Sequence, residues 1–227
     1  MEISVIIPVL NEATSIGQVL AAIPAETGIE IVIVDGGSSD GSLEIANSSR
    51  AVVVLERRRG YGQACASGAA ASQGEILVFM DGDGADDPAR LPDLVAPLES
   101  GTADLVLASR LAGQLQPGAM PWHQKMGNQL AVQCINRLYR QSLTDLSPCR
   151  ALRRADLLKL NMEEMSYGWP VEMIVKAARL GWRVVEIPVE HRPRIGGKSK
   201  ISGTLRGSLL AAYAIMRTIG RYTRKPL

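Results

Sequence analysis

The sequence predicts an α/β fold in which a mostly parallel central sheet carries helices on both faces. Runs rich in β-branched residues alternate with helix-like segments through the first half of the chain, an order typical of parallel sheets. These runs are apolar almost throughout, which indicates strands buried on both faces. With 227 residues, 46% hydrophobic and 21% charged, the chain suits one globular domain.

Five strands are predicted in the first half, each followed by a helix or a turn. The strands cover residues 3–9, 29–34, 51–55, 75–80 and 104–108. The intervening helices cover residues 13–23, 41–47, 61–72 and 88–98. Pro24 ends the first helix and Asp40 caps the second, while Asp87 caps the fourth, with Pro88 at its first position.

The second half is less regular. A loop rich in Gly and Pro spans residues 113–121, and apolar residues at helical spacing predict a helix over 122–140. A helix over 170–180, a strand over 182–189, a basic loop over 190–203 and a final helix over 204–222 follow. Because neither an internal repeat nor a low-complexity linker interrupts the chain, we expect residues 1–227 to form one domain.

Cysteine usage and charge restrict the cellular setting and the partners. The three cysteines are far apart and include no Cys-x-x-Cys pair, which favours reduced thiols in a cytoplasmic protein. Residues 181–227 contain ten basic and two acidic residues, although the whole chain has a net charge of only +2. This basic end suggests an anionic partner. Nucleic acid is disfavoured because aromatic residues are only 4% and the remaining chain is net negative.

The strongest local signal follows the fourth predicted strand, where Asp81, Asp83, Asp86 and Asp87 fall within seven residues. Two carboxylates separated by one residue in an irregular turn can converge on one hard cation. Capping of helix 88–98 needs only one acid, and the pattern fails as an EF-hand because Ala85 and Pro92 stand where that loop needs ligands. We therefore predict a divalent metal site here.

Other predicted strand ends also carry polar residues, and ligands of open parallel sheets bind at this edge. Glu12 is a candidate for contact with a ribose hydroxyl or a base, and the alternative is a carboxylate that stabilises the start of a helix. Asp35 is a candidate for nucleotide recognition, because the small residues after it let a ligand approach. The arginines before Gly60 suit phosphate, or an exposed loop. Strand 3–9 lacks the glycine-rich turn of NAD and FAD sites, and Gly197-Lys198-Ser199 lacks the first glycine of a P-loop.

Six motifs in order make the chain resemble family 2 glycosyltransferases, especially the dolichol-phosphate (polyprenyl-phosphate) mannosyl- and glucosyltransferases. The six motifs are residues 8–12, 34–41, 60–68, 78–88, 144–154 and 194–203. The resemblance implies the nucleotide-diphospho-sugar transferase (GT-A) fold, an inverting mechanism and a donor site that depends on Mg²⁺ or Mn²⁺. It divides the domain into a nucleotide-sugar-binding half (1–110), an acceptor half (111–203) and a C-terminal helix (204–227).

The resemblance also implies residue roles. Asp81 and Asp83 would bind the metal held by the donor diphosphate, with Asp83 also catalytic, and Arg110 would face the acceptor or the diphosphate. Asp145 would be the acceptor-side acid, and it and Arg110 are candidate catalytic residues. Asp145 would orient a phosphate acceptor or act as the base for a hydroxyl acceptor. The residues expected to bind the nucleotide or phosphate are Pro8, Leu10, Glu12, Asp35, Gly60, Asp81, Arg194, Ser199 and Lys200.

The implied reaction moves a hexose from UDP- or GDP-hexose to a polyprenyl phosphate. Transfer to a soluble or glycan hydroxyl stays open, as does a non-catalytic nucleotide-sugar-binding role. Two glycines follow Asp35 where the mannosyltransferases have a second acid, so the base and the sugar stay undetermined. The chain lacks the C-terminal spans common in this branch, and its final helix suits either peripheral contact with a membrane or pairing of two copies.

Overall fold

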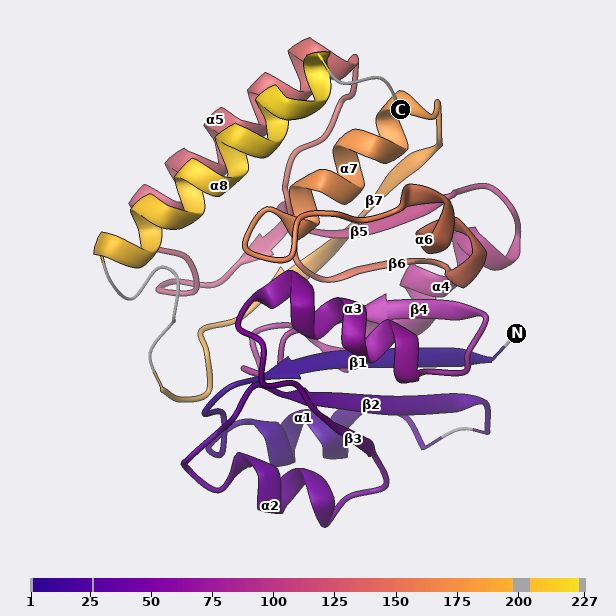
Figure 1. The fold of residues 1–227 in the computed structure, drawn as a ribbon, viewed down its shortest axis with the longest axis vertical. Helices are drawn as coiled ribbons and strands as arrows, with labels where there is room; N and C mark the ends of the chain where they lie inside the picture. The colour runs from indigo at the N-terminus through magenta and orange to yellow at the C-terminus, as the bar shows by residue number, and fades with distance from the viewer. Residues whose placement is uncertain (1, 26, 198–204, 225–227) are drawn as a thin grey trace.

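The computed structural model describes residues 2–25, 27–197 and 205–224. Its centre is a seven-stranded sheet in the order β3-β2-β1-β4-β6-β5-β7 (Figure 1). The strands are β1 (Ile3–Val9), β2 (Ile29–Asp35), β3 (Val52–Leu55), β4 (Ile76–Phe79), β5 (Leu105–Leu115), β6 (Arg150–Arg153) and β7 (Val184–His191). Only β6 among these runs antiparallel to its neighbours, so the prediction of a mostly parallel sheet is confirmed.

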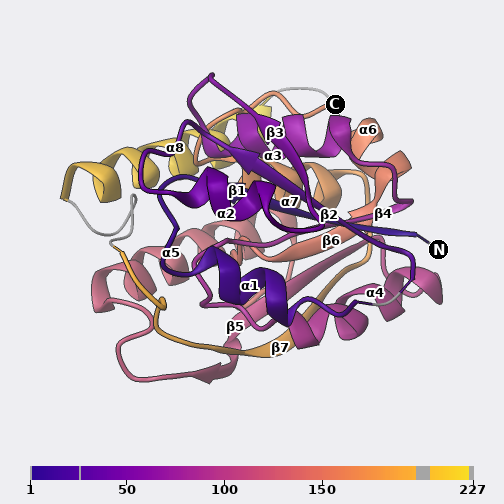
Figure 2. The same ribbon diagram turned by 90° about the horizontal axis from the view of Figure 1, so that it is seen from below.

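Helices cover both faces of the sheet (Figure 2). One face packs on α1 (Ile16–Ala22), α2 (Ser42–Asn47) and α4 (Leu91–Glu99), which follows a 3-10 turn, η1 (Pro88–Arg90). The helices on the other face are α3 (Tyr61–Ala71), α5 (Trp122–Tyr139), α6 (Arg154–Leu160), α7 (Trp169–Arg179) and α8 (Leu205–Arg224). Successive residues of β1 point to opposite faces of the sheet. Ile6 is buried in the core on the side of α3 and α7, and Ile7 is buried in the core on the side of α1 and α4.

The elements predicted from the sequence are present, with shifted ends. The first helix begins three residues later than expected, because a turn precedes it in which the Ser15 amide donates to the Glu12 carbonyl. The predicted loop 113–121 is partly wrong, because β5 continues to Leu115 after a register shift against β7. Asp87 caps η1 through the Ala89 amide, as expected.

β6 and α6 were not predicted. β6 has four residues and charged side chains at both ends, so it lacks the continuous apolar run that marks the parallel strands. It nevertheless sits between β4 and β5, where Ala151 and Leu152 are fully buried.

α8 lies in front of α5 in Figure 1 and packs on α5 and α7. The Tyr139 hydroxyl at the end of α5 donates to the Ile219 carbonyl of α8 at 2.6 Å, and the Tyr222 hydroxyl donates to the buried Glu172 carboxylate of α7. Within the described residues, no helix has the length and hydropathy needed to cross a membrane. All three cysteines are free thiols.

Candidate active site

The acidic turn after β4 lies against the segment that follows β7. The Arg192 amide donates to the Ala85 carbonyl at 3.0 Å, and the Ile195 amide donates to the Asp83 carbonyl at 3.1 Å. β1, β2 and β4 are parallel neighbours, so their carboxyl ends reach the same edge of the sheet. The acids after β4 and the basic residues after β7, far apart in the sequence, therefore form one site.

Asp83 is the centre of this site. One of its carboxylate oxygens accepts from the Ala85 amide at 3.0 Å, which fixes the turn. The other accepts from Arg194 at 2.8 Å, and the same guanidinium donates to both Glu12 oxygens at 2.6 and 2.8 Å. Asp83, Glu12 and Arg194, all of them predicted site residues, are thus brought together, with two negative charges on one cation.

The acids of the turn raise one another's pKa. Burial and the nearby charges of Asp83 and Asp86 raise the pKa of Asp81 to about 7. Burial also raises the pKa of Asp83, although the Ala85 amide and the charge of Arg194 act against it. A cation placed here would favour the ionised carboxylates and relieve this repulsion.

Asp86 and His191 add a pair that the sequence did not indicate as metal-binding. The His191 Nδ1 atom lies 3.4 Å from an Asp86 carboxylate oxygen. Both atoms are buried and lack a hydrogen-bond partner among the described residues. Because buried polar atoms are nearly always satisfied, this pair suits a ligand that supplies the missing contact.

The residues fit a divalent cation that shares its ligands with a substrate. Within the described residues, no group of three or more His, Cys, Asp and Glu side chains forms a complete site. However, carboxylates line the turn, and Asp83 shares the single charge of Arg194 with Glu12, which leaves negative charge for a cation. Mg²⁺ is commonly held by one or two carboxylates together with substrate phosphates, which is the arrangement that Asp81 and Asp83 can offer.

Asp35 ends β2 at the same edge of the sheet. One carboxylate oxygen accepts from the amides of Gly37 and Ser38 at 2.8 and 2.9 Å. The other oxygen is buried and has no partner in the described part of the chain. Asp35 is therefore held rigidly with an acceptor available for a donor group such as a base N–H. Pro8 and Leu10 lie at the end of the neighbouring β1, where Leu10 is exposed.

Arg110 and Asp145, both predicted to be catalytic, form a buried ion pair. The guanidinium donates to both Asp145 oxygens at 2.7 Å, and the Arg110 amide donates to one of them at 2.9 Å. Burial alone would raise the pKa of Asp145, but the hydrogen bonds and charge of Arg110 lower it. A carboxylate with a lowered pKa and both oxygens engaged suits the positioning of Arg110 better than proton abstraction.

Gly60, expected to contact the nucleotide, has a clear packing role. Its φ is +139°, and an added Cβ would lie 2.2 Å from the Met165 carbonyl oxygen. We expect Gly60→Ala to lower the free energy of unfolding by roughly 2–4 kcal/mol through backbone strain and overlap. Urea denaturation measures this effect. Gly127→Ala on α5 is the matched control, because nothing lies within 4 Å of its added Cβ, and no destabilisation there is expected.

The remaining predicted residues, Ser199 and Lys200, lie outside the described residues. Besides the pair of Asp86 and His191, the sequence analysis missed two further features. Arg150 of β6 is fully buried and donates to backbone carbonyls including that of Pro170 at 2.6 Å. Glu56, directly after β3, accepts from Arg58 at 2.7 Å and from Ser67, and these bonds lower its pKa. Glu56 therefore engages one of the arginines that were considered for phosphate binding.

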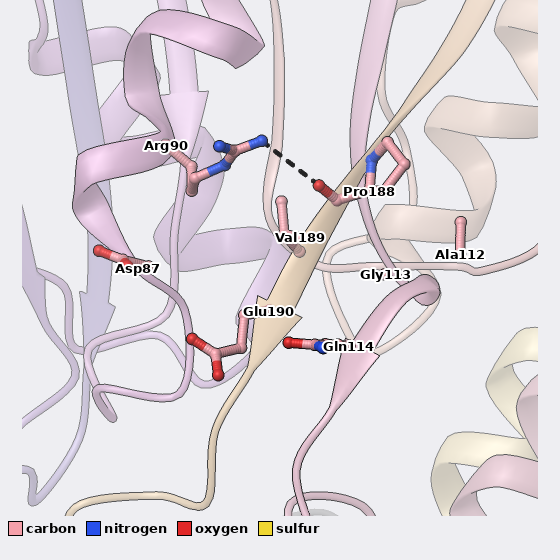
Figure 3. A pocket seen from close by; sticks show the side chains of 8 residues that line it. All are labelled: Asp87, Arg90, Ala112, Gly113, Gln114, Pro188, Val189 and Glu190. Carbon is pink, nitrogen blue, oxygen red and sulfur yellow. Dashed lines mark hydrogen bonds between the residues drawn. The ribbon is translucent and has the colours of Figure 1, made fainter.

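A cavity of about 560 Å³ lies beside the acidic turn, between η1 and the ends of β5 and β7 (Figure 3). Its lining includes Asp87, Arg90, Gln114 and Glu190. Arg192, next to the cavity, donates to Asp87 and Glu190 at 3.0 and 2.9 Å. Arg90 pairs with Asp93, so the charged lining residues are engaged by neighbours outside the lining. The lining includes neither Asp35 nor Asp86, whose buried oxygens have no partner among the described residues.

The chain matches one known protein family and is similar to several known proteins. Residues 4–160 match Glycosyl transferase family 2. An uncharacterized glycosyltransferase of Mycobacterium tuberculosis is 40% identical over 220 residues, which cover 96% of this chain and 97% of the relative. An undecaprenyl-phosphate mannosyltransferase of Micrococcus luteus is 33% identical over 224 residues, covering 91% of this chain and 90% of the relative.

The fold also matches solved structures. Glucosyl-3-phosphoglycerate synthase from Mycobacterium tuberculosis, solved in complex with Mn²⁺, UDP and phosphoglyceric acid, superposes with a TM-score of 0.78 at 26% identity. The match covers 100% of this chain and 80% of that chain. The GT-A type of fold that the resemblance implied is thereby confirmed. Because the family match spans more than half of the chain and the relatives align over nearly all of it, this protein belongs to glycosyltransferase family 2.

Proposed function

We propose that the protein transfers a hexose from a nucleotide-diphospho-sugar, with UDP or GDP as the nucleotide, to a polyprenyl phosphate, and that Mg²⁺ or Mn²⁺ takes part. One observation carries the donor half of this proposal. The acidic turn holds Asp81 and Asp83 at the carboxyl edge of the sheet, where Asp83 contacts the basic Arg194 at 2.8 Å. Carboxylates that can bind a cation and a guanidinium that can bind phosphate thus lie side by side. A diphosphate with a bound metal ion requires both kinds of group.

The base, the cation and the phosphates of the donor each have a candidate partner among the described residues. The unpartnered oxygen of Asp35 can accept from the base, and Pro8 and Leu10 border it. Asp81 and Asp83 would hold the cation, with Asp86 and His191 beside them. Arg194 can exchange its carboxylate partners for phosphate oxygens, because guanidinium binds both in the same forked geometry. The family resemblance adds Ser199 and Lys200 on the phosphate side.

In the proposed reaction, the anomeric carbon becomes oxocarbenium-like as its bond to the nucleotide diphosphate breaks and the diphosphate gains charge. When bound, the divalent cation supplies Lewis-acid stabilisation of that leaving group. Arg194 adds a positive charge at the same place. Arg110, whose pKa is raised by Asp145 and by the acids of the turn against the opposing effect of burial, stays cationic. Asp145 keeps it oriented.

The acceptor assignment rests on the role of Asp145. A hydroxyl acceptor needs a general base, whereas a phosphate acceptor is already an anion. Asp145, the acid that the sequence offers as a base, is occupied by Arg110, which favours phosphate. The similarity to the undecaprenyl-phosphate mannosyltransferase supports the same acceptor class. The structural similarity to glucosyl-3-phosphoglycerate synthase supports the second candidate, a small soluble acceptor.

A donor and acceptor screen tests the proposal. UDP- and GDP-hexoses are incubated with Mn²⁺, with or without a short polyprenyl phosphate, and nucleotide release and lipid-linked sugar are measured. We expect release that depends on the lipid phosphate and yields one hexose per lipid. Nucleotide release that does not depend on the lipid phosphate but increases with 3-phosphoglycerate would instead support the soluble acceptor. Absence of release with every donor and acceptor would contradict the donor assignment.

A further inference from the structure

The outer sides of α5 and α8 expose an unusual number of large apolar side chains. On α5 these residues recur every four positions, and on α8 they follow the same helical spacing. Their exposed fractions range from 44% at Met216 to 74% at Trp122. The six residues that define this surface, called the α5–α8 face, are Trp122, Met126, Leu130, Leu209, Tyr213 and Met216. Such a concentration of exposed apolar residues marks a binding surface.

The charge of the same two helices has one sign. α5 and α8 together contain six basic residues and no acidic residue, whereas the rest of the chain has more acidic than basic residues. Lys125, Arg137 and Arg217 are exposed. Arg221 is exposed as well, although it pairs with Glu163 at 2.5 Å. An apolar stripe on helices that themselves carry only basic charges is complementary to an anionic surface that has an apolar interior.

The inner sides of these helices are held in place. Ala131, Val132 and Ile135 of α5 and Ile219 and Tyr222 of α8 are buried in the core that α7 shares. The hydrogen bond from Tyr139 to Ile219 joins the carboxyl-terminal parts of both helices. Both helices therefore run in the same direction, and their amino-terminal ends lie on the side where β1, β2 and β4 end (Figure 1).

We propose that the α5–α8 face docks onto the surface of an anionic lipid bilayer, with its aromatic and aliphatic side chains at the boundary between headgroups and acyl chains. Tyr and Trp suit that boundary, because each has an apolar body and a polar group. A second copy of this chain fits the face less well, since pairing identical faces would bring two all-cationic helix pairs together. The inference deepens the proposed function, because docking presents the donor site to a phosphate anchored in the same bilayer.

Flotation with phospholipid vesicles tests the docking without donor, metal or lipid acceptor. The full chain is mixed with vesicles of phosphatidylcholine alone or with added phosphatidylglycerol. We expect binding only to the anionic vesicles, weakened by salt. Replacing Trp122, Leu209 and Tyr213 together by Ser should lower the partition coefficient at least about a hundredfold. Removal of one charge in Arg217→Gln should lower it about fivefold, which corresponds to about 1 kcal/mol near such a surface.

Leu158→Ser is the matched control, because Leu158 on α6 is 74% exposed, as Trp122 is, but lies outside the face. It should bind as the unaltered protein does. Circular dichroism verifies that each variant is folded, and Arg217→Gln tests the proposal even if the triple variant is not. Equal binding to neutral vesicles, no binding at all, or a dimer in sedimentation that loses its stability with the triple variant would each overturn the docking. Binding to vesicles without hexose transfer to lipid phosphate would leave the docking standing and contradict only the acceptor assignment.

Discussion

Replacing Asp83 by Asn is expected to lower kcat by about a thousandfold or more, because the carboxylate that would hold the cation loses its charge. Stabilisation of the leaving diphosphate by a metal amounts to several kcal/mol of the barrier, and each 1.4 kcal/mol is a factor of ten. Asn keeps the size of the side chain and can still accept from the Ala85 amide. Nucleotide release in the presence of saturating Mn²⁺ measures the effect.

Asp87→Asn is the matched control in the same turn. Asp87 accepts from the Ala89 amide at 3.0 Å and from Arg192, so Asn removes one acidic charge and keeps the oxygen that caps the helix. We expect a loss of less than about 1 kcal/mol in stability and less than about a tenfold loss in kcat. Equal losses of activity in both variants would mean that general charge, and not a bound cation at Asp83, explains the acidic turn.

Breaking the ion pair between Arg110 and Asp145 is expected to have the largest effect on stability. In Asp145→Asn, the buried guanidinium keeps its charge without a counter-charge, which costs about 3–5 kcal/mol in such pairs. Replacing Arg110 by Met and Asp145 by Leu in one protein should recover part of this loss, because no uncompensated charge then stays buried. Denaturant unfolding measures both.

The ion pair between Arg110 and Asp145 should also make the stability of the protein depend on pH. Because the pKa of Asp145 in the folded protein is lowered, its contribution to stability is complete above its unfolded pKa of about 3.9 and is lost as the pH falls through the folded value. The difference in unfolding free energy between the unaltered protein and Asp145→Asn should therefore be constant near neutral pH and shrink in acid. A stable but inactive Asp145→Asn protein would instead indicate a general base and a hydroxyl acceptor.

The sequence predicted the parallel part of the sheet because those strands are apolar on both faces, as in Val5, Ile6 and Ile7, which are fully buried. β6 escaped prediction because its position depends on neighbours from distant parts of the chain. Arg150, at its start, would usually indicate an exposed residue. It is buried because the backbone carbonyls of Leu146 and Pro170 accept its hydrogen bonds, which no local pattern reveals.

In the candidate site, too, local sequence patterns predicted some features, and others depend on the tertiary structure. Asp81 and Asp83 were predicted as metal ligands because their spacing is local, and that role stays a prediction. The contact between Asp86 and His191 joins the turn after β4 to the end of β7, and only the tertiary structure brings them together. Arg110 and Asp145 were each singled out, but their pairing was not foreseen. Of the two roles that the sequence left open for Asp145, orientation or proton abstraction, that pairing favours the positioning of Arg110.

Titration calorimetry of UDP and GDP binding, with Mn²⁺ and then with EDTA, tests the metal-dependent donor site most directly. We expect at least one nucleotide to bind at least about ten times more tightly with Mn²⁺, and we expect Asp83→Asn to abolish that difference. Equal affinity with Mn²⁺ and with EDTA, for both nucleotides, would contradict a cation held between the acidic turn and the diphosphate.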